Sequence, residues 1–64
     1  MRPVRILLVE DNPADVQLIR LGLQAKPEFQ FELFVVEDGD QALDFLHRRE
    51  GWEKAAVPDL ILLD

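Results

Sequence analysis

The pattern of apolar and polar positions predicts three strands in this chain. Residues 6–9 and 60–63 form short apolar runs bounded by polar residues, which is typical of strands buried on both faces of a parallel sheet. We expect the first of these strands to extend over 2–9. In 29–37 apolar and polar residues alternate, so that one face is apolar throughout and the other only near its end. This second pattern favours a strand at the edge of a sheet.

Two helices are predicted between the strands. The first covers 13–25, because Asn12 can accept a hydrogen bond at the helix N-terminus and a proline follows at the first helical position. The second begins after Asp38, which can form a capping box with Gln41, and it ends before Gly51. Strands that alternate with helices in this way are typical of an α/β fold with a parallel sheet.

The strand patterns also predict the order of the strands in the sheet. Helical connections between parallel strands are right-handed almost without exception, so the third strand either extends the sheet beyond the second or returns to the free side of the first. The edge-like second strand favours the return, which gives the order 2-1-3 with the two helices on opposite faces. The carboxyl ends of the first and third strands then meet at a topological switch point, where α/β proteins bind their ligands.

Three carboxylates are predicted to converge at that switch point. Glu10 and Asp11 follow the first strand, and Asp64 follows the third. Carboxylates a few ångströms apart repel one another unless a cation intervenes, and oxygen ligands without Cys or His favour Mg²⁺. We expect all three to hold Mg²⁺, and Asp64, alone on its strand, to be the nucleophile that accepts a phosphoryl group. The alternative is that each acid merely caps a strand end or a helix start.

Composition and charge narrow the possible functions. The chain has 64 residues, 48% of them hydrophobic and 31% charged, which is typical of one small globular domain. A parallel sheet usually needs a longer chain, so we expect a part of a larger domain. The formal net charge of −6 argues against a nucleic-acid partner. Without cysteines, a signal peptide or a membrane-length apolar run, a cytoplasmic protein with no membrane contact is expected.

Three segments carry a resemblance to a known family. They are Ile6-Leu7-Leu8-Val9-Glu10-Asp11-Asn12, Val36-Glu37-Asp38-Gly39-Asp40-Gln41-Ala42-Leu43 and Pro58-Asp59-Leu60-Ile61-Leu62-Leu63-Asp64. In this order and spacing they resemble the receiver domain of two-component response regulators. The long charged loop before the third segment is similar to that of single-domain regulators that partner bacterial phytochrome-type kinases.

The resemblance implies a flavodoxin-like (CheY-like) receiver fold, of which residues 1–64 are the N-terminal portion. It implies that Asp64 is the phosphoacceptor and takes its phosphoryl group from a phosphohistidine of a sensor histidine kinase. Asp11 would bind Mg²⁺ directly, and Glu10 would assist through water. The chain would be a signalling module and not an enzyme. Because later parts of a receiver site are missing, we expect phosphotransfer by these 64 residues alone to be impaired.

The first predicted helix carries two apolar stripes. One consists of Ala14, Leu18, Leu21, Gly22 and Ala25. The other, Val16, Ile19 and Leu23, is expected on the far side and exposed in this chain. In a complete receiver this second stripe would pack partly against the last helix. Alternatively, Val16 and Ile19 form a docking surface for the helical bundle of a kinase, since receivers present their first helix to their partners.

Two other functions stay open. A toprim-like nucleic-acid enzyme also places a Glu at the end of its first strand, but that fold expects Gly at the next position, where this chain has Asp11. The second alternative is that the chain is an interaction module that is not phosphorylated. It would then self-associate through the exposed strand edge at 60–63, or pair with the part of a receiver that it lacks.

Overall fold

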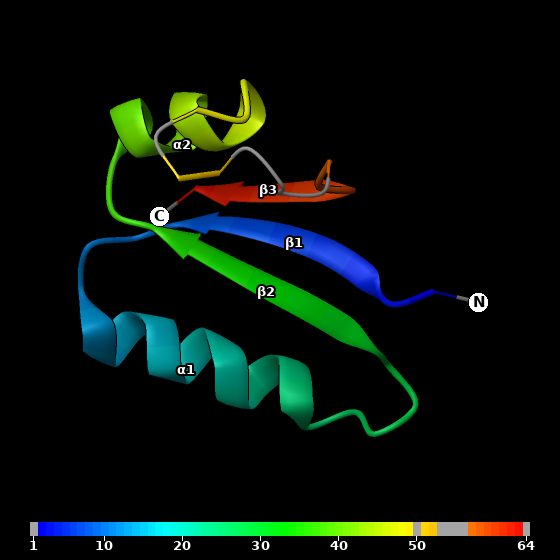
Figure 1. Ribbon diagram of the computed structural model, residues 1–64. Helices are drawn as coiled ribbons and strands as arrows, with labels where there is room; N and C mark the ends of the chain where they lie inside the picture. Colours follow the sequence, from blue (N-terminus) through cyan, green and yellow to red (C-terminus); the bar gives the residue numbers. More distant parts are fainter. Residues whose placement is uncertain (1, 50, 53–56, 64) are drawn as a thin grey trace.

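The computed structural model describes residues 2–49, 51–52 and 57–63 and shows a three-stranded parallel sheet with one helix on each face (Figure 1). The elements are β1 (Val4–Val9), α1 (Pro13–Gln24), β2 (Phe31–Val36), α2 (Gly39–Leu46) and β3 (Leu60–Leu63). The strand order is β2-β1-β3, with both pairs parallel. The predicted order and the predicted placement of the helices are therefore confirmed.

The helix N-termini follow the predicted capping chemistry. The Asn12 side chain accepts a hydrogen bond from the backbone N–H of Ala14 at 2.9 Å. Asp38 Oδ1 accepts one from the backbone N–H of Gln41 at 2.8 Å. In return, Gln41 Oε1 accepts from the backbone N–H of Glu37, one residue earlier than a standard capping box would have it. These caps fix where the chain turns from each strand into the following helix.

The second strand is shorter than predicted at its amino end. Phe29 donates its backbone N–H to the carbonyl of Lys26 at 2.9 Å, so this part of the chain forms a turn after α1. Pairing with β1 begins at Phe31, which lies opposite Val4. The apolar side chain of Phe29 is nevertheless used, because its ring stacks on that of Phe31 with centroids 5.9 Å apart.

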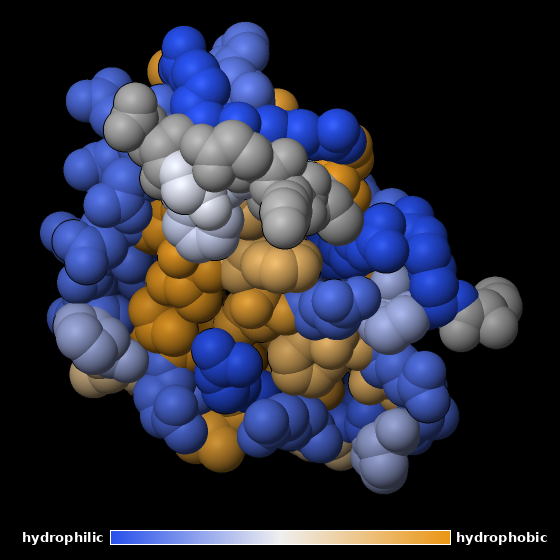
Figure 2. All heavy atoms as spheres, viewed as in Figure 1, coloured by the Kyte–Doolittle hydropathy of each residue, from blue (hydrophilic) through white to orange (hydrophobic). Residues whose placement is uncertain are grey.

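The face of the sheet that α2 covers carries a hydrophobic cluster. Its buried members are Leu7, Val36 and Phe45, against which Val9, Phe34, Ala42 and Trp52 pack. The Phe45 ring lies 5.4 Å from that of Phe34 and 5.0 Å from that of Trp52. Side chains alternate along a strand, so Ile6 and Leu8, also fully buried, belong to the face that α1 covers. Figure 2 shows apolar residues gathered between the two helices and hydrophilic residues around them.

The orientation predicted for α1 is wrong. Val16, Ile19 and Leu23 are half-buried, whereas Leu18 and Leu21 on the other stripe are 66% and 53% exposed. The physical reason is the apolar area that each stripe can bury. The stripe that faces the sheet consists of three large branched side chains, whereas the other has two large ones separated by the small Ala14, Gly22 and Ala25.

Candidate functional site at the carboxyl edge of the sheet

Glu10 is the buried acid of the site. It follows β1 directly, its backbone N–H donates to the Val36 carbonyl at 2.9 Å, and only 7% of the residue is exposed. Its Oε1 accepts a hydrogen bond from the backbone N–H of Asn12 at 2.9 Å. The side chain is thus folded back over the loop between β1 and α1, and the buried acid has a hydrogen-bond partner there.

Asp11 stands beside it and is exposed. The two residues line a hollow of about 230 Å³ whose other walls are Pro13, Val16, Val35 and Glu37. Half of its lining residues are therefore acids and the other half are apolar. Carboxylate oxygens with neither His nor Cys beside them suit a hard cation such as Mg²⁺.

Glu37 is the residue of this hollow that the sequence analysis did not select. It follows β2 directly, so it leaves the sheet at the same edge as Glu10 and Asp11. The signal was available, since every parallel strand ends at this edge. Like Glu10 and Asp64, Glu37 follows an apolar run, here 33–36.

The third predicted acid, Asp64, lies outside the described residues. The described chain ends with Leu63, which pairs with Val9 and so lies beside the end of β1. Among the residues that the structure places, no group of three or more His, Cys, Asp or Glu could hold a metal ion. The predicted convergence of Glu10, Asp11 and Asp64 on Mg²⁺ therefore stays a prediction.

The prediction of a docking surface at Val16 and Ile19 assumed that both side chains are exposed, and the structure does not show this exposure. Both are half-buried, and Val16 lines the hollow together with Val35. The apolar surface that α1 turns outward consists instead of Leu18 and Leu21.

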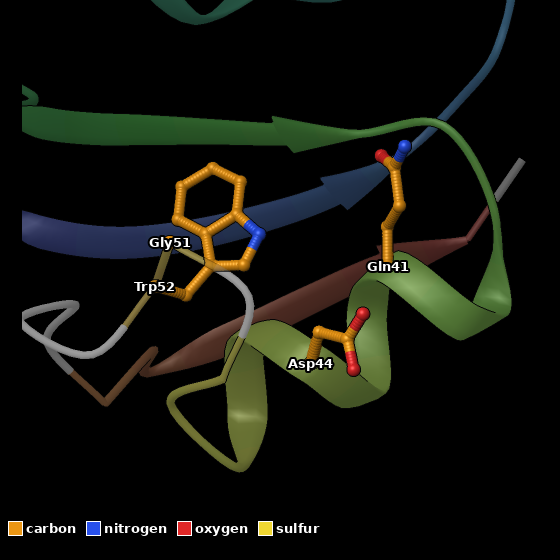
Figure 3. A pocket seen from close by; sticks show the side chains of 4 residues that line it. All are labelled: Gln41, Asp44, Gly51 and Trp52. Atoms are coloured by element: carbon orange, nitrogen blue, oxygen red, sulfur yellow. The ribbon is translucent and has the colours of Figure 1, made fainter.

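A second hollow, of about 770 Å³, lies beside α2 and is lined by Gln41, Asp44, Gly51 and Trp52 (Figure 3). Two of its lining side chains already have partners. Gln41 bonds to the backbone N–H of Glu37, and Asp44 forms an ion pair with Arg49 at 3.3 Å. The indole of Trp52 packs on Phe45, so this hollow lies at the rim of the hydrophobic cluster.

Comparison with known proteins places the chain among signalling proteins, although no family model matches it. The response regulator Rcp1 of Synechocystis sp. is 40% identical over 62 residues, which make up 97% of this chain and 42% of Rcp1. The hybrid signal transduction histidine kinase I of Dictyostelium discoideum is 38% identical over 64 residues, which are 100% of this chain and 3% of that protein.

A solved structure agrees with these relatives. The phosphorylated cyanobacterial phytochrome response regulator RcpA matches with a TM-score of 0.86 and 41% identity, over 98% of this chain and 44% of RcpA. The chain is homologous to response regulators. The fold described above is that of a CheY-like receiver, and the resemblance read from the three sequence segments is confirmed. The chain spans less than half the length of the response regulators that it matches.

No helix in the described part of the chain is long and apolar enough to cross a membrane. Three acids, Glu10, Asp11 and Glu37, lie close together where β1 and β2 end.

Proposed function

We propose that the chain is a phosphoacceptor receiver module of a two-component system, with Asp64 as the residue that is phosphorylated. The observation that carries the proposal is the register of the sheet. Leu63 lies opposite Val9, so the residue that follows β3 in the chain is the counterpart of Glu10, which follows β1. The 41% identity to RcpA, which was solved in its phosphorylated form, supports the same assignment.

The proposed chemistry is the transfer of a phosphoryl group from a phosphohistidine. A carboxylate oxygen of Asp64 forms a bond to phosphorus, the bond from phosphorus to the imidazole nitrogen breaks, and the electron pair stays with the imidazole. Glu10, Asp11 and Asp64 would hold Mg²⁺, which offsets the charge of the carboxylates and of the incoming phosphoryl group. Glu10 is already oriented by the Asn12 N–H, so its carboxylate is fixed before any cation binds.

The proposed partner is a sensor histidine kinase. RcpA is a phytochrome response regulator, and the Dictyostelium relative is a hybrid histidine kinase. These names support a histidine kinase as partner, and RcpA supports one of phytochrome type. Since the relatives are signalling proteins, the toprim-like alternative gains no support from them.

Phosphoryl uptake from acetyl phosphate and Mg²⁺ tests the proposal. The 64-residue chain would be assayed beside a chimera in which it replaces the matching segment of RcpA, because we expect the chain alone to be impaired. Intact mass would report uptake. Asp64→Asn is expected to abolish it, whereas Asp40→Asn, which removes an exposed acid from the first turn of α2, is expected to leave it unchanged. Equal uptake by the Asp64→Asn chimera would refute the proposal.

A second candidate function is self-association through β3 without phosphorylation. It is favoured by the exposure of that strand, where Leu60, Ile61 and Leu63 are 46%, 44% and 79% exposed. A strand with an unpaired edge is a template for pairing with another chain. The two functions are separable, because association would survive Asp64→Asn and phosphoryl uptake would not.

A further inference from the structure

The amino end of β3 is fixed to β1 by a group of contacts that centre on Asp59. The backbone N–H of Asp59 donates to the Arg5 carbonyl at 2.7 Å, and Asp59 Oδ2 accepts from the Arg5 backbone N–H at 2.9 Å. Asp59 therefore binds both backbone groups of one residue of the neighbouring strand, β1. These bonds continue the β1–β3 pairing by one position, because the next pair is Ile6 with Leu60.

The guanidinium of Arg2 also binds the Asp59 carboxylate. Arg2 Nη1 donates to Asp59 Oδ2 at 2.7 Å, and Nη2 donates to Oδ1 at 2.6 Å, which is the bidentate geometry of a well-oriented guanidinium–carboxylate pair. The two side chains are 52% and 36% exposed. An exposed ion pair adds little to the free energy of unfolding, so the use of this pair lies in its geometry.

Little else in β3 specifies its alignment with β1. The strand has four residues, Leu60, Ile61, Leu62 and Leu63, which are all aliphatic. A slip of one or two positions would exchange one aliphatic side chain for another, so the packing of side chains discriminates weakly between registers. Asp59 supplies what the strand lacks, because its carboxylate can bind the Arg5 N–H and the Arg2 guanidinium together in one register.

We propose that Asp59, held by Arg2, is a positioning residue that sets the register of β3 and thereby places Asp64 relative to Glu10 and Asp11. A slip of one residue moves the strand by about 3.3 Å, which is roughly the length of a hydrogen bond and enough to take an acid out of a shared cation site. The last step of this inference rests on the proposed function of Asp64, whereas the register step does not.

The register can be measured directly on the 64-residue chain. Cross-strand proton contacts in NMR spectra would be compared for two pairs that share Val9, namely Val9 with Leu63 and Val9 with Val36. Asp59→Ala is expected to lose or weaken the first contact and to keep the second. General destabilisation would weaken both together, so their ratio separates a loss of register from a loss of stability.

Glu32→Ala is the matched control. Glu32 is also an exposed acid and also pairs with Arg5, at 3.8 Å from Nε, but through the side chain and not through the backbone. This variant is expected to keep the wild-type ratio. If Asp59→Ala does not fold, Arg2→Ala decides, because it leaves the Arg5 bonds in place and is expected to lower the ratio partially. An unchanged ratio in every folded variant at positions 2 and 59 would overturn the proposal.

A second measurement keeps this proposal apart from the proposed function. Phosphoryl uptake would be assayed in the RcpA chimera carrying Asp59→Ala or Glu32→Ala, and only the former is expected to lower it. If the unsubstituted chimera takes up no phosphoryl group, the function proposed for Asp64 fails, while the NMR ratio still decides whether Asp59 sets the register. If the ratio falls and uptake stays normal, the link from register to Asp64 is refuted.

Discussion

Phe45 is the buried residue of α2, and it ties that helix to the sheet. It is 1% exposed and lies between the rings of Phe34 and Trp52. We predict that Phe45→Ala lowers the free energy of unfolding by about 3–5 kcal/mol, which is much of the stability of a small domain. Urea titration followed by circular dichroism would measure this. Leu46→Ala, at a position 43% exposed, is expected to cost far less, and equal costs would contradict the packing described here.

Asp59 is the residue whose titration reports on its contacts. Hydrogen bonds from Arg2 and then from the Arg5 backbone lower the pKa of its carboxyl from 3.8 to about 2. A carboxyl whose pKa is lower in the folded state stabilises the fold above the unfolded pKa, and this contribution is lost as the pH falls through the folded pKa. The stabilising effect of Asp59 is therefore expected to be complete above about pH 4 and to disappear towards pH 2.

NMR titration of the Asp59 carboxyl carbon would check this prediction. A midpoint well below that of an ordinary aspartate is expected in the wild-type chain, and Arg2→Ala should raise it, since the Arg2 hydrogen bond is the largest cause of the shift. A wild-type midpoint near 3.8 would show that the pair does not form in solution.

At the scale of the elements, α1 shows which of two apolar stripes a helix turns inward. Ile19 is half-buried against the sheet, and Leu18, one position earlier, is 66% exposed. We predict that Ile19→Asp lowers the free energy of unfolding by about 2 kcal/mol or more, because it buries a charge without a partner. Leu18→Asp is expected to stay within roughly 0.5 kcal/mol of the wild type. Denaturant titration of the two variants would distinguish the orientations, and the reverse ranking would favour the orientation expected from sequence.

The strands and the helix caps could be predicted from sequence because each depends on neighbouring residues, and the strand order followed from the edge-like pattern of 29–37 and the right-handed connections. Asn12 and Asp38 indicate helix N-termini, because each accepts a hydrogen bond from a backbone N–H within the next three residues. The apolar run at 6–9 indicates a buried strand. The orientation of α1 could not be predicted from sequence, because both of its stripes are apolar and only packing against the sheet decides between them.

Some features of the candidate site could likewise be predicted from sequence, and others could not. Glu10 and Asp11 were found because they follow an apolar run, which is a local signal. The pair of Arg2 and Asp59 joins residues 57 positions apart, and nothing near either residue predicts the other. The burial of Glu10 was also not predictable, because it follows from the hydrogen bond to Asn12 and from the loop that this bond shapes.

At the scale of the whole molecule, the two edges of the sheet differ. Both helices pack against β2, whereas β3 pairs with β1 on one side and leaves Ile61 and Leu63 44% and 79% exposed. We predict that the 64-residue chain self-associates through this edge. Sedimentation velocity at several concentrations would show it. Ile61→Lys is expected to reduce association, and Leu18→Lys on the outer face of α1 is expected to leave it unchanged. A wild-type chain that remains monomeric at all concentrations would refute the prediction.

The pairing of β3 with β1 has a consequence for how the molecule folds. Arg5 and Asp59 lie 54 positions apart in a chain of 64 residues, so their contact closes nearly the longest loop available. Contacts between distant residues form late, because the entropy of closing the loop is lost before the contact contributes. The unit of β1, α1 and β2 can assemble from nearer neighbours, and β3 would then add to a preformed edge. The strand that precedes the proposed phosphoacceptor would be the last to form, so a partly folded chain would hold Glu10, Asp11 and Glu37 in place before Asp64 joins them.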